Sequence, residues 1–282
     1  MSESDKYPED SGRRRFVKGV VGGAALAGVG TAAAGTINTA TTSPGKGGGT
    51  TQDYAIENID GPAPRGMPII PLEITSDGYL KGAWPKVQKV TENGVQTTIA
   101  KTENYKGAGI TFSSTWYQYC GLQTYKQIRP GYDGDLFLRS DASPAYQWQK
   151  DEYSKGDKLH VDSFKDYKSW GNGIGKSGLG KPATGTWRSQ DVQDTLPIQV
   201  IKSKFIYEAA KKSKVVDALT QDGFVAWLDK CTHFCCVPGF KQTSTSAKFD
   251  AQNHVYCPCH QSVYDPFSIV SNLFTALPIP EK

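Results

Sequence analysis

Two short segments near the C-terminus, each with a cysteine and a histidine, constrain this chain more than any other feature. The first, residues 231–236, reads CTHFCC, and the second, residues 257–264, reads CPCHQSVY; twenty residues separate them. The chain has only four histidines, so two matched pairs of thiol and imidazole are a specific signal. Both side-chain types bind zinc and iron, and neither suits calcium or magnesium. The sequence therefore predicts one metal centre held between two loops.

The same segments contain two further cysteines, Cys236 and Cys259, one in each loop. A structural zinc site would place four ligands on one ion and would not need these two cysteines. They could instead bond to each other and join the loops. The residues by themselves are compatible with zinc or with an iron–sulfur cluster.

The pattern C-x-H-x-x-C followed by C-x-C-H-x-S-x-Y resembles the Rieske [2Fe-2S] motif, in which cysteines hold one iron and histidines the other. The matching residues are Cys231, His233, Cys236, Cys257, Cys259, His260, Ser262 and Tyr264. The resemblance implies that Cys231 and Cys257 bind the inner iron. It implies that His233 and His260 bind the outer iron.

The resemblance also assigns roles to the remaining positions of the motif. It implies a disulfide between Cys236 and Cys259, which oxygenase-type Rieske domains usually lack. Ser262 and Tyr264 match the donors of hydrogen bonds to a bridging sulfide and to a ligand sulfur, which raise the reduction potential. The chain is thus similar to Rieske proteins of the quinol-oxidising, cytochrome bc type, and in its motif details to archaeal respiratory ones.

Two positions depart from the family pattern. Cys235 stands where the first loop usually has a glycine, and Gln261 stands where the second loop has one. Glycine serves where the backbone needs a positive φ or a close approach. We therefore expect both loops to run slightly differently from the family form.

Composition limits the remaining possibilities. The chain has 282 residues, of which 38% are hydrophobic and 11% aromatic, which is enough for a substantial core. Its 32 basic and 28 acidic residues nearly balance, which argues against nucleic-acid binding. Cys120 and Cys235 remain outside the assigned set. They are either two buried thiols or, if the domain lies outside the cytoplasm, a second disulfide.

The N-terminus predicts export and membrane attachment. Residues 1–18 end in GRRRFVK, which fits a twin-arginine signal, and residues 19–38 form an uncharged apolar segment. This segment is either a cleaved signal or a retained transmembrane helix, and the resemblance to bc-type proteins favours retention. Residues 39–52 read as a flexible Gly/Thr linker. We expect a cell-membrane protein, anchored at its N-terminus, with its head domain on the extracytoplasmic face.

The rest of the chain predicts a mainly β fold. Residues 53–196 show short apolar runs between Gly, Pro and Asp, typical of a β-rich, loop-rich extension or insertion. The resemblance implies that residues 197–282 form a Rieske-type antiparallel β-sandwich, with a cluster-binding subdomain whose loops are residues 231–240 and 257–266. A proline-containing segment at 277–280 resembles the loop that covers the cluster in this family.

Local patterns within these regions predict individual elements. We expect strands at residues 198–201 and 224–228, a helix at 207–219, and a hairpin formed by residues 247–250 and 254–256. Residues 173–178 fit GxGxxG, but no strand precedes them, so we interpret them as a surface loop.

The function implied by the resemblance is that of the Rieske subunit of a membrane quinol oxidoreductase of the bc type. Such a subunit takes an electron and a proton from quinol bound by a cytochrome b-type subunit, and passes the electron to a cytochrome c or a blue-copper protein. His233 or His260 would make the catalytic contact with quinol. No stand-alone catalysis is expected.

Two alternatives remain open. The first is the Rieske small subunit of an exported molybdenum oxidoreductase, similar to an arsenite oxidase. The second belongs to another class, a zinc-binding structural module. An oxygenase would need a second iron bound by two histidines and a carboxylate, and only His160 and His254 would be left for it.

Overall fold

The computed structural model describes residues 49–92 and 95–276. The chain divides into two units, Met1–Thr42 and Ser43–Lys282, and all described residues belong to the second. The predicted signal, the apolar segment after it, most of the linker and the proline-containing segment 277–280 lie outside the described residues. No helix within the described ranges is long and apolar enough to span a membrane.

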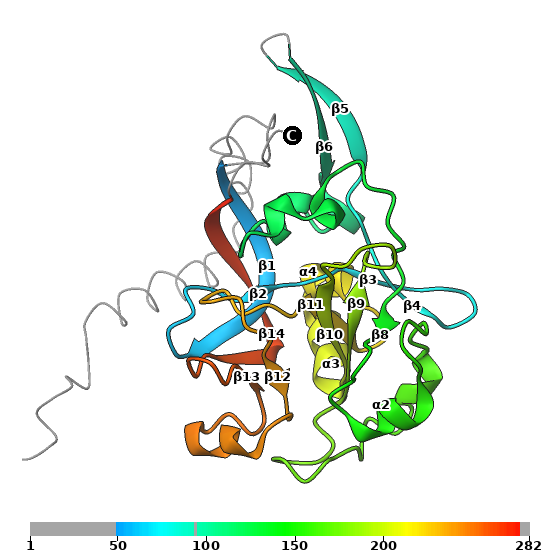
Figure 1. Ribbon diagram of the computed structural model, residues 1–282, viewed down its shortest axis with the longest axis vertical. Helices are drawn as coiled ribbons and strands as arrows, with labels where there is room; N and C mark the ends of the chain where they lie inside the picture. The colour runs from blue at the N-terminus through cyan, green and yellow to red at the C-terminus, as the bar shows by residue number, and fades with distance from the viewer. Residues whose placement is uncertain (1–48, 93–94, 277–282) are drawn as a thin grey trace, which may run out of the picture. The chain divides into compact units, whose positions relative to one another are not determined.

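The described part is mainly β, as predicted, with several antiparallel sheets and few helices. The largest sheet has the strand order β12-β13-β14-β1-β2 (Figure 1). Its strands are β1 (Gly49–Asp60), β2 (Met67–Pro68), β12 (Gly239–Phe240), β13 (Val255–Tyr256) and β14 (Val263–Ala276). β1 pairs with β14 along its length, from Gly49 opposite Ala276 to Asp60 opposite Val263. The first and last described strands therefore lie side by side.

This pairing crosses two of the predicted boundaries. β1 begins at Gly49, inside the predicted linker 39–52, because its Gly and Thr backbone groups find partners in β14. β1 and β2 fall largely within the predicted extension 53–196, yet they complete the sheet from which the second cysteine loop emerges. Local composition does not reveal a strand partner that lies about 200 residues away.

The second sheet has the order β11-β10-β9-β8. Its strands are β8 (Arg139–Ser140), β9 (Lys181–Trp187), β10 (Leu196–Lys202) and β11 (Phe224–Leu228). β10 and β11 confirm the strands expected at 198–201 and 224–228. All five side chains of β11 are buried, which explains its continuous apolar sequence. β8, at one edge of this sheet, and its neighbour β9 again come from the predicted extension, so residues 53–196 share both large sheets with the C-terminal region.

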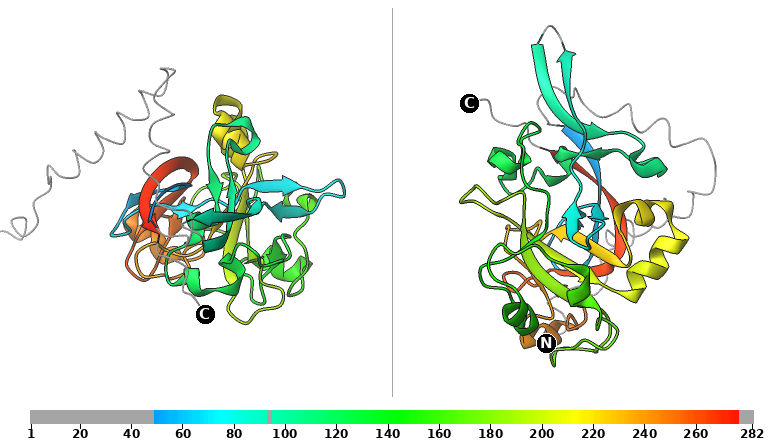
Figure 2. Two further views of the ribbon diagram at one scale, coloured as in Figure 1. Left: turned by 90° about the horizontal axis from the view of Figure 1, so that it is seen from above. Right: turned by 90° about the vertical axis from the view of Figure 1, so that its right-hand side faces the viewer.

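Smaller elements complete the fold. The remaining strands are β3 (Leu72–Ile74), β4 (Leu80–Gly82), β5 (Val87–Glu92), β6 (Val95–Thr102) and β7 (Phe112–Ser113). The α-helices are α2 (Gln147–Glu152), α3 (Lys204–Lys212) and α4 (Lys214–Leu219). The 3-10 helices are η5 (Tyr105–Gly107), η6 (Ser114–Tyr117), η7 (Leu122–Thr124), η8 (Lys126–Ile128), η9 (Val161–Phe164) and η10 (Ser244–Phe249). Figure 2 shows the β5–β6 hairpin extending away from the two large sheets, and α3 and α4 lying near β14.

Two local predictions were wrong in part. The helix expected at 207–219 is two helices, because Ser213 has an extended backbone and its side chain accepts a hydrogen bond from the Val216 amide, which starts α4. Residues 247–250 are not a strand. They lie at the end of η10, whose first turn is capped by the Thr243 side chain. β13 follows, at the position of the second predicted strand.

Buried aromatic side chains join the predicted extension to the C-terminal sheets. Trp116, Tyr117, Trp187 and Trp227 are fully buried and belong to one continuous core. The rings of Tyr117 and Trp187 are 5.4 Å apart, centroid to centroid, in an edge-to-face arrangement. These aromatic side chains therefore pack in the core that the two regions share.

Candidate metal centre

The first cysteine loop begins three residues after β11 and leads into β12, so it passes from one large sheet to the other. Two backbone hydrogen bonds close it. The Cys231 amide donates to the Cys236 carbonyl at 2.7 Å, and the Cys235 amide donates to the Cys231 carbonyl at 2.9 Å. Cys231 is buried, His233 and Cys236 are half-buried, and the backbone turns back on itself around them.

The second loop connects β13 to β14 and repeats this pattern residue for residue. The Cys257 amide donates to the Ser262 carbonyl at 2.9 Å, and the Gln261 amide donates to the Cys257 carbonyl at 2.9 Å. In each loop the first cysteine therefore bonds to the residue five positions on, and the residue four positions on bonds back to it. The two loops are local repeats in space, although their sequences share little beyond Cys and His.

The two residues that stand where the Rieske motif has glycine both have a positive φ, 65° at Cys235 and 62° at Gln261. At both positions the backbone has the conformation for which glycine is suited, and a different course of the loops from the family form stays a prediction. A residue with a Cβ pays roughly 1–2 kcal/mol to adopt it. Other contacts must offset that cost.

Two disulfides surround the loops. Cys236 is bonded to Cys259, with Cα atoms 6.7 Å apart, and this bond joins the two loops to each other. Cys120 is bonded to Cys235, with Cα atoms 5.6 Å apart, and this bond joins the first loop to the predicted extension. The first pairing is the one that the resemblance implies, and the second settles the alternative left open for Cys120 and Cys235.

The two remaining cysteines, Cys231 and Cys257, are free thiols and almost fully buried. The interaction with Cys257 lowers the pKa of Cys231 to about 5, and the interaction with Cys231 raises the pKa of Cys257. The backbone amides two and three residues further along each loop act to lower the pKa of each thiol. This environment favours the thiolate form at Cys231.

The imidazoles of the two loops lie next to each other. The ring centroids of His233 and His260 are 4.7 Å apart, and the rings are nearly perpendicular. The Nδ1 atom of His233 is buried and has no hydrogen-bond partner among the described residues. A buried nitrogen without a partner is costly unless something binds it. This atom is therefore a candidate metal ligand on geometric grounds.

The sulfur atoms of Cys236, Cys257 and Cys259 all lie within 4.8 Å of one another. Cys236 and Cys259 are joined in the disulfide, so only Cys257 of this group can offer a thiolate. The free donors that converge from the two loops are therefore two thiols and two imidazoles. By residue type, this set matches the ligands of a [2Fe-2S] cluster of the Rieske type, and it also matches those of a four-coordinate zinc ion.

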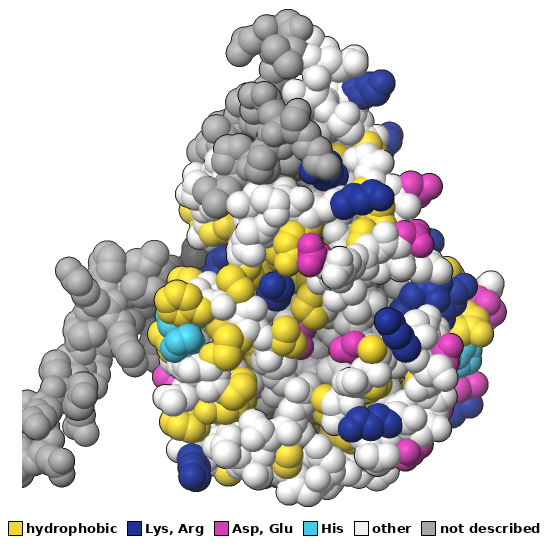
Figure 3. Space-filling view, in the orientation of Figure 1, with side chains coloured by type: hydrophobic (Ala, Val, Ile, Leu, Met, Phe, Trp, Pro, Cys, Tyr) yellow, Lys and Arg dark blue, Asp and Glu magenta, His cyan; other side chains and the backbone are white. Residues whose placement is uncertain are grey.

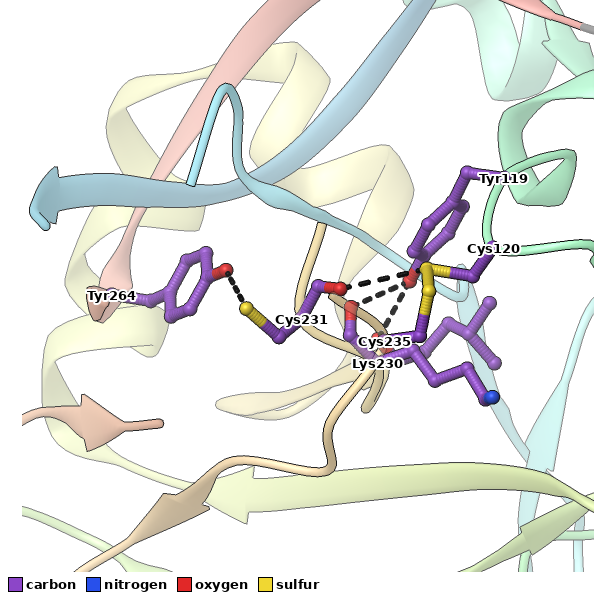
Figure 4. The surroundings of a disulfide bond; sticks show 7 residues. Tyr119, Cys120, Lys230, Cys231, Cys235 and Tyr264 are labelled. Atoms are coloured by element: carbon purple, nitrogen blue, oxygen red, sulfur yellow. Dashed lines mark hydrogen bonds between the residues drawn. A yellow bond between two sulfur atoms is a disulfide. The ribbon is translucent and has the colours of Figure 1, made fainter. Parts of the chain in front are cut away.

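Tyr264 and Ser262 are both fully buried beside the loops. The Tyr264 hydroxyl donates a hydrogen bond to the Cys231 sulfur at 3.2 Å (Figure 4). The Ser262 hydroxyl oxygen accepts a hydrogen bond from the Ala63 amide at 3.2 Å. The contact expected of Tyr264 to a ligand sulfur is therefore present. The Ser262 hydroxyl retains its proton for a further acceptor.

A segment that sequence reasoning missed covers both loops. Residues 61–66, GPAPRG, follow β1 directly. In this segment the Ala63 amide bonds to Ser262 of the second loop, and the Arg65 carbonyl accepts a 2.6 Å hydrogen bond from Thr232 of the first loop. Gly61 lies so close to the second loop that a Cβ there would be 2.6 Å from the Gln261 carbonyl oxygen. In the sequence, the only feature that could have drawn attention to this segment is its two prolines, which lie between two glycines.

The other sequence candidates lie away from this centre. The glycine-rich segment 173–178 is a surface loop, as interpreted, and Gly175 packs against the backbone of Gln252. Both ring nitrogens of His160 are occupied: Nε2 is 2.7 Å from the Asp77 carbonyl, and Nδ1 accepts from the Asp162 amide. Neither feature contributes to the cysteine loops.

Comparison with protein-family models, with curated proteins and with solved structures gave no match for this chain. The functional conclusion therefore rests on the donors of the two loops and on what surrounds them.

Proposed function

We propose that this chain is the Rieske-type iron–sulfur subunit of a membrane quinol oxidoreductase of the bc type. The observation that carries the proposal is the convergence of four free donors, Cys231, Cys257, His233 and His260, on two loops joined by a disulfide. A zinc site would need only the four donors. Two further features favour a redox centre: the disulfide holds the two loops together, and the hydrogen bond from Tyr264 to the Cys231 sulfur stabilises the thiolate and tunes the potential of the centre.

Cys231 and Cys257 would hold one iron, and His233 and His260 the other. A cluster with two thiolate and two neutral imidazole ligands carries no net charge when oxidised, so it accepts one electron at potentials of about −150 to +300 mV, compared with about −400 mV for all-cysteine plant ferredoxins. The Tyr264 hydroxyl favours the upper end, since donation to a ligand sulfur withdraws negative charge from the centre.

The chain's own residues can receive a quinol at the tip of the loops. His260 is exposed and His233 is half-buried, so an imidazole can accept a hydrogen bond from a quinol hydroxyl and take up its proton. Phe234 is 65% exposed and contacts both imidazole rings, and Val237 is 53% exposed. Figure 3 shows hydrophobic and histidine side chains together on one face. Such a surface suits docking into an apolar quinol site of a cytochrome b-type partner.

The location and the further partners belong to the same proposal. We place the protein in the cell membrane, held by its N-terminal segment, with the two loops on the extracytoplasmic face. Both disulfides support an oxidising compartment. The electron acceptor would be a cytochrome c or a blue-copper protein.

The test is to purify the membrane-bound protein, determine iron, acid-labile sulfide and zinc, and record the EPR spectrum after reduction by dithionite and by quinol. We expect two irons and two sulfides per chain and a signal after either reductant. Zinc without a signal would replace the proposal by the structural module. A signal that appears with dithionite but not with quinol, together with co-purification of a molybdenum subunit instead of a diheme cytochrome b, would replace the bc-type assignment.

A further inference from the structure

Two neighbouring residues of the predicted extension hold the first cysteine loop from outside. Cys120 forms the disulfide with Cys235 across 115 residues of sequence. The hydroxyl of Tyr119 donates to the Lys230 carbonyl at 2.9 Å and lies 3.5 Å from the Leu228 carbonyl. Figure 4 shows both side chains reaching the loop from the same segment. The Cys120 sulfur, which has no proton in the disulfide, lies 3.6 Å from the Cys231 carbonyl oxygen.

These contacts fall on two critical places of the loop. Tyr119 binds the backbone immediately before the ligand Cys231, where β11 has ended. Cys120 binds Cys235, the residue with a φ of 65° that closes the turn through its amide. One contact therefore fixes the entry to the loop and the other fixes its strained residue.

The second loop keeps its left-handed residue without a covalent bond. The carbonyl of Gln261 lies against Gly61, and Ser262 is bonded to Ala63 of the covering segment. The first loop receives only one hydrogen bond from that segment, from Thr232 to Arg65. The two loops thus have the same backbone pattern but different external support.

We propose that Tyr119 and Cys120 are positioning residues of the metal centre, and that the Cys120–Cys235 disulfide holds Cys235 in the left-handed conformation that a glycine would adopt unaided. This proposal rests on the proposed function only where it treats the loop as a carrier of metal ligands. The effect of the disulfide on the backbone of Cys235 does not depend on that function. Cys235 and Cys236 are adjacent and bonded to different segments. The first loop is therefore fixed covalently to the extension on one side and to the second loop on the other.

The decisive comparison uses two double variants that both lack the disulfide, Cys120→Ala/Cys235→Ala and Cys120→Ala/Cys235→Gly. They differ by one methyl group at the residue with positive φ. Amide hydrogen exchange of residues 231–236 should be about tenfold faster than in the wild type for the alanine variant. It should return to within about threefold for the glycine variant, because glycine does not need the disulfide. Equal exchange in the two variants would overturn the proposal, since the disulfide would then act only by restricting the unfolded chain.

Two further readouts keep the test independent of folding and of the cofactor. Tyr119→Phe should speed amide exchange at Cys231, whereas Tyr125→Phe, in the same segment, should not; equal effects would contradict the role of Tyr119.

In protein that contains the cluster, the EPR line shape should be altered in the alanine double variant and restored in the glycine double variant. Protein without a cluster would refute the proposed function, but the exchange ranking would still decide the role of the disulfide.

Discussion

Cys235 and Gln261 occupy equivalent positions in two loops with the same hydrogen-bond pattern, and their φ angles are 65° and 62°. Each amide donates back to the free cysteine four residues earlier. Since neither residue is glycine, each loop holds a strained backbone, and the structure shows a different support for each. The disulfide to Cys120 supports Cys235, and the close approach of Gly61 supports Gln261.

Replacing Gln261 with glycine should therefore stabilise the protein. The side chain of Gln261 is exposed, so the substitution removes the left-handed cost of roughly 1–2 kcal/mol and adds about 0.5–1 kcal/mol of unfolded-state entropy. We expect a net gain of about 0.5–1 kcal/mol in the free energy of unfolding, measured with urea. Gln96→Gly, at an exposed strand position, is the control and should lose about as much. A loss at both positions would mean that Gln261 is not strained.

The covering segment can be tested with a matched pair of glycines. Gly61 has a φ of 82°, and an added Cβ would lie 2.6 Å from backbone atoms of the second loop. Gly109 has a φ of 72° with nothing within 4 Å of an added Cβ. Both alanine variants carry the same backbone cost, about 1 kcal/mol, so the excess destabilisation of Gly61→Ala measures the clash. We expect faster amide exchange in residues 257–262 for Gly61→Ala alone. Unchanged exchange there would show that the segment does not support the loop.

Removing the Tyr264 hydroxyl should lower the reduction potential of the proposed centre. Burial raises the pKa of Tyr264, so its hydroxyl remains a donor to the Cys231 sulfur at neutral pH. A hydrogen bond worth about 1 kcal/mol corresponds to about 40 mV for a one-electron couple. A redox titration of Tyr264→Phe should show a decrease of that order.

The control for this substitution is Tyr146→Phe. The hydroxyl of Tyr146 is also buried and donates to the Phe240 carbonyl at 2.6 Å, so its removal should reduce stability by a similar amount without moving the potential. Equal potentials in the wild type and in Tyr264→Phe would rule out the tuning role of Tyr264.

Asp53 should make stability depend on pH. Burial raises the pKa of this carboxyl from 3.8 to about 6, more than Arg65 and the Asn272 amide lower it. Between about pH 4 and 6 the folded protein therefore holds a proton that the unfolded chain releases. The free energy of unfolding should fall as the pH rises through this window, by on the order of 3 kcal/mol.

Asp53→Asn should remove this part of the pH dependence. The measurement is the free energy of unfolding of the wild type and of the variant at pH 4 and at pH 6.5, and its change between the two pH values should be smaller in the variant. Arg65, whose guanidinium is 2.5 Å from Asp53, keeps its stacking on the Phe274 ring in the variant, at 3.7 Å from the centroid in the wild type. Parallel pH profiles for the two proteins would show that Asp53 stays ionised in the folded state.

Local sequence was a good guide where the chemistry depends on residue type and short spacing. Cys231, His233, Cys257 and His260 lie within two loops of six residues, so any fold that brings the loops together also brings their donors together. The strand β11 was predictable for a similar reason, since its five consecutive buried side chains leave a continuous apolar pattern. Ser213 was missed because a single capping side chain divided one helix into two.

The sequence by itself determined the donors, their order and the mainly β character, because these are properties of single residues and short windows. Only the tertiary structure decided that β1 pairs with β14, that residues 61–66 cover both loops, and that Cys120 reaches Cys235. Each of these contacts joins segments more than a hundred residues apart. An alternating or proline-containing segment shows which face it can bury or where it can turn, but not its partner. The partner is chosen when the whole core packs.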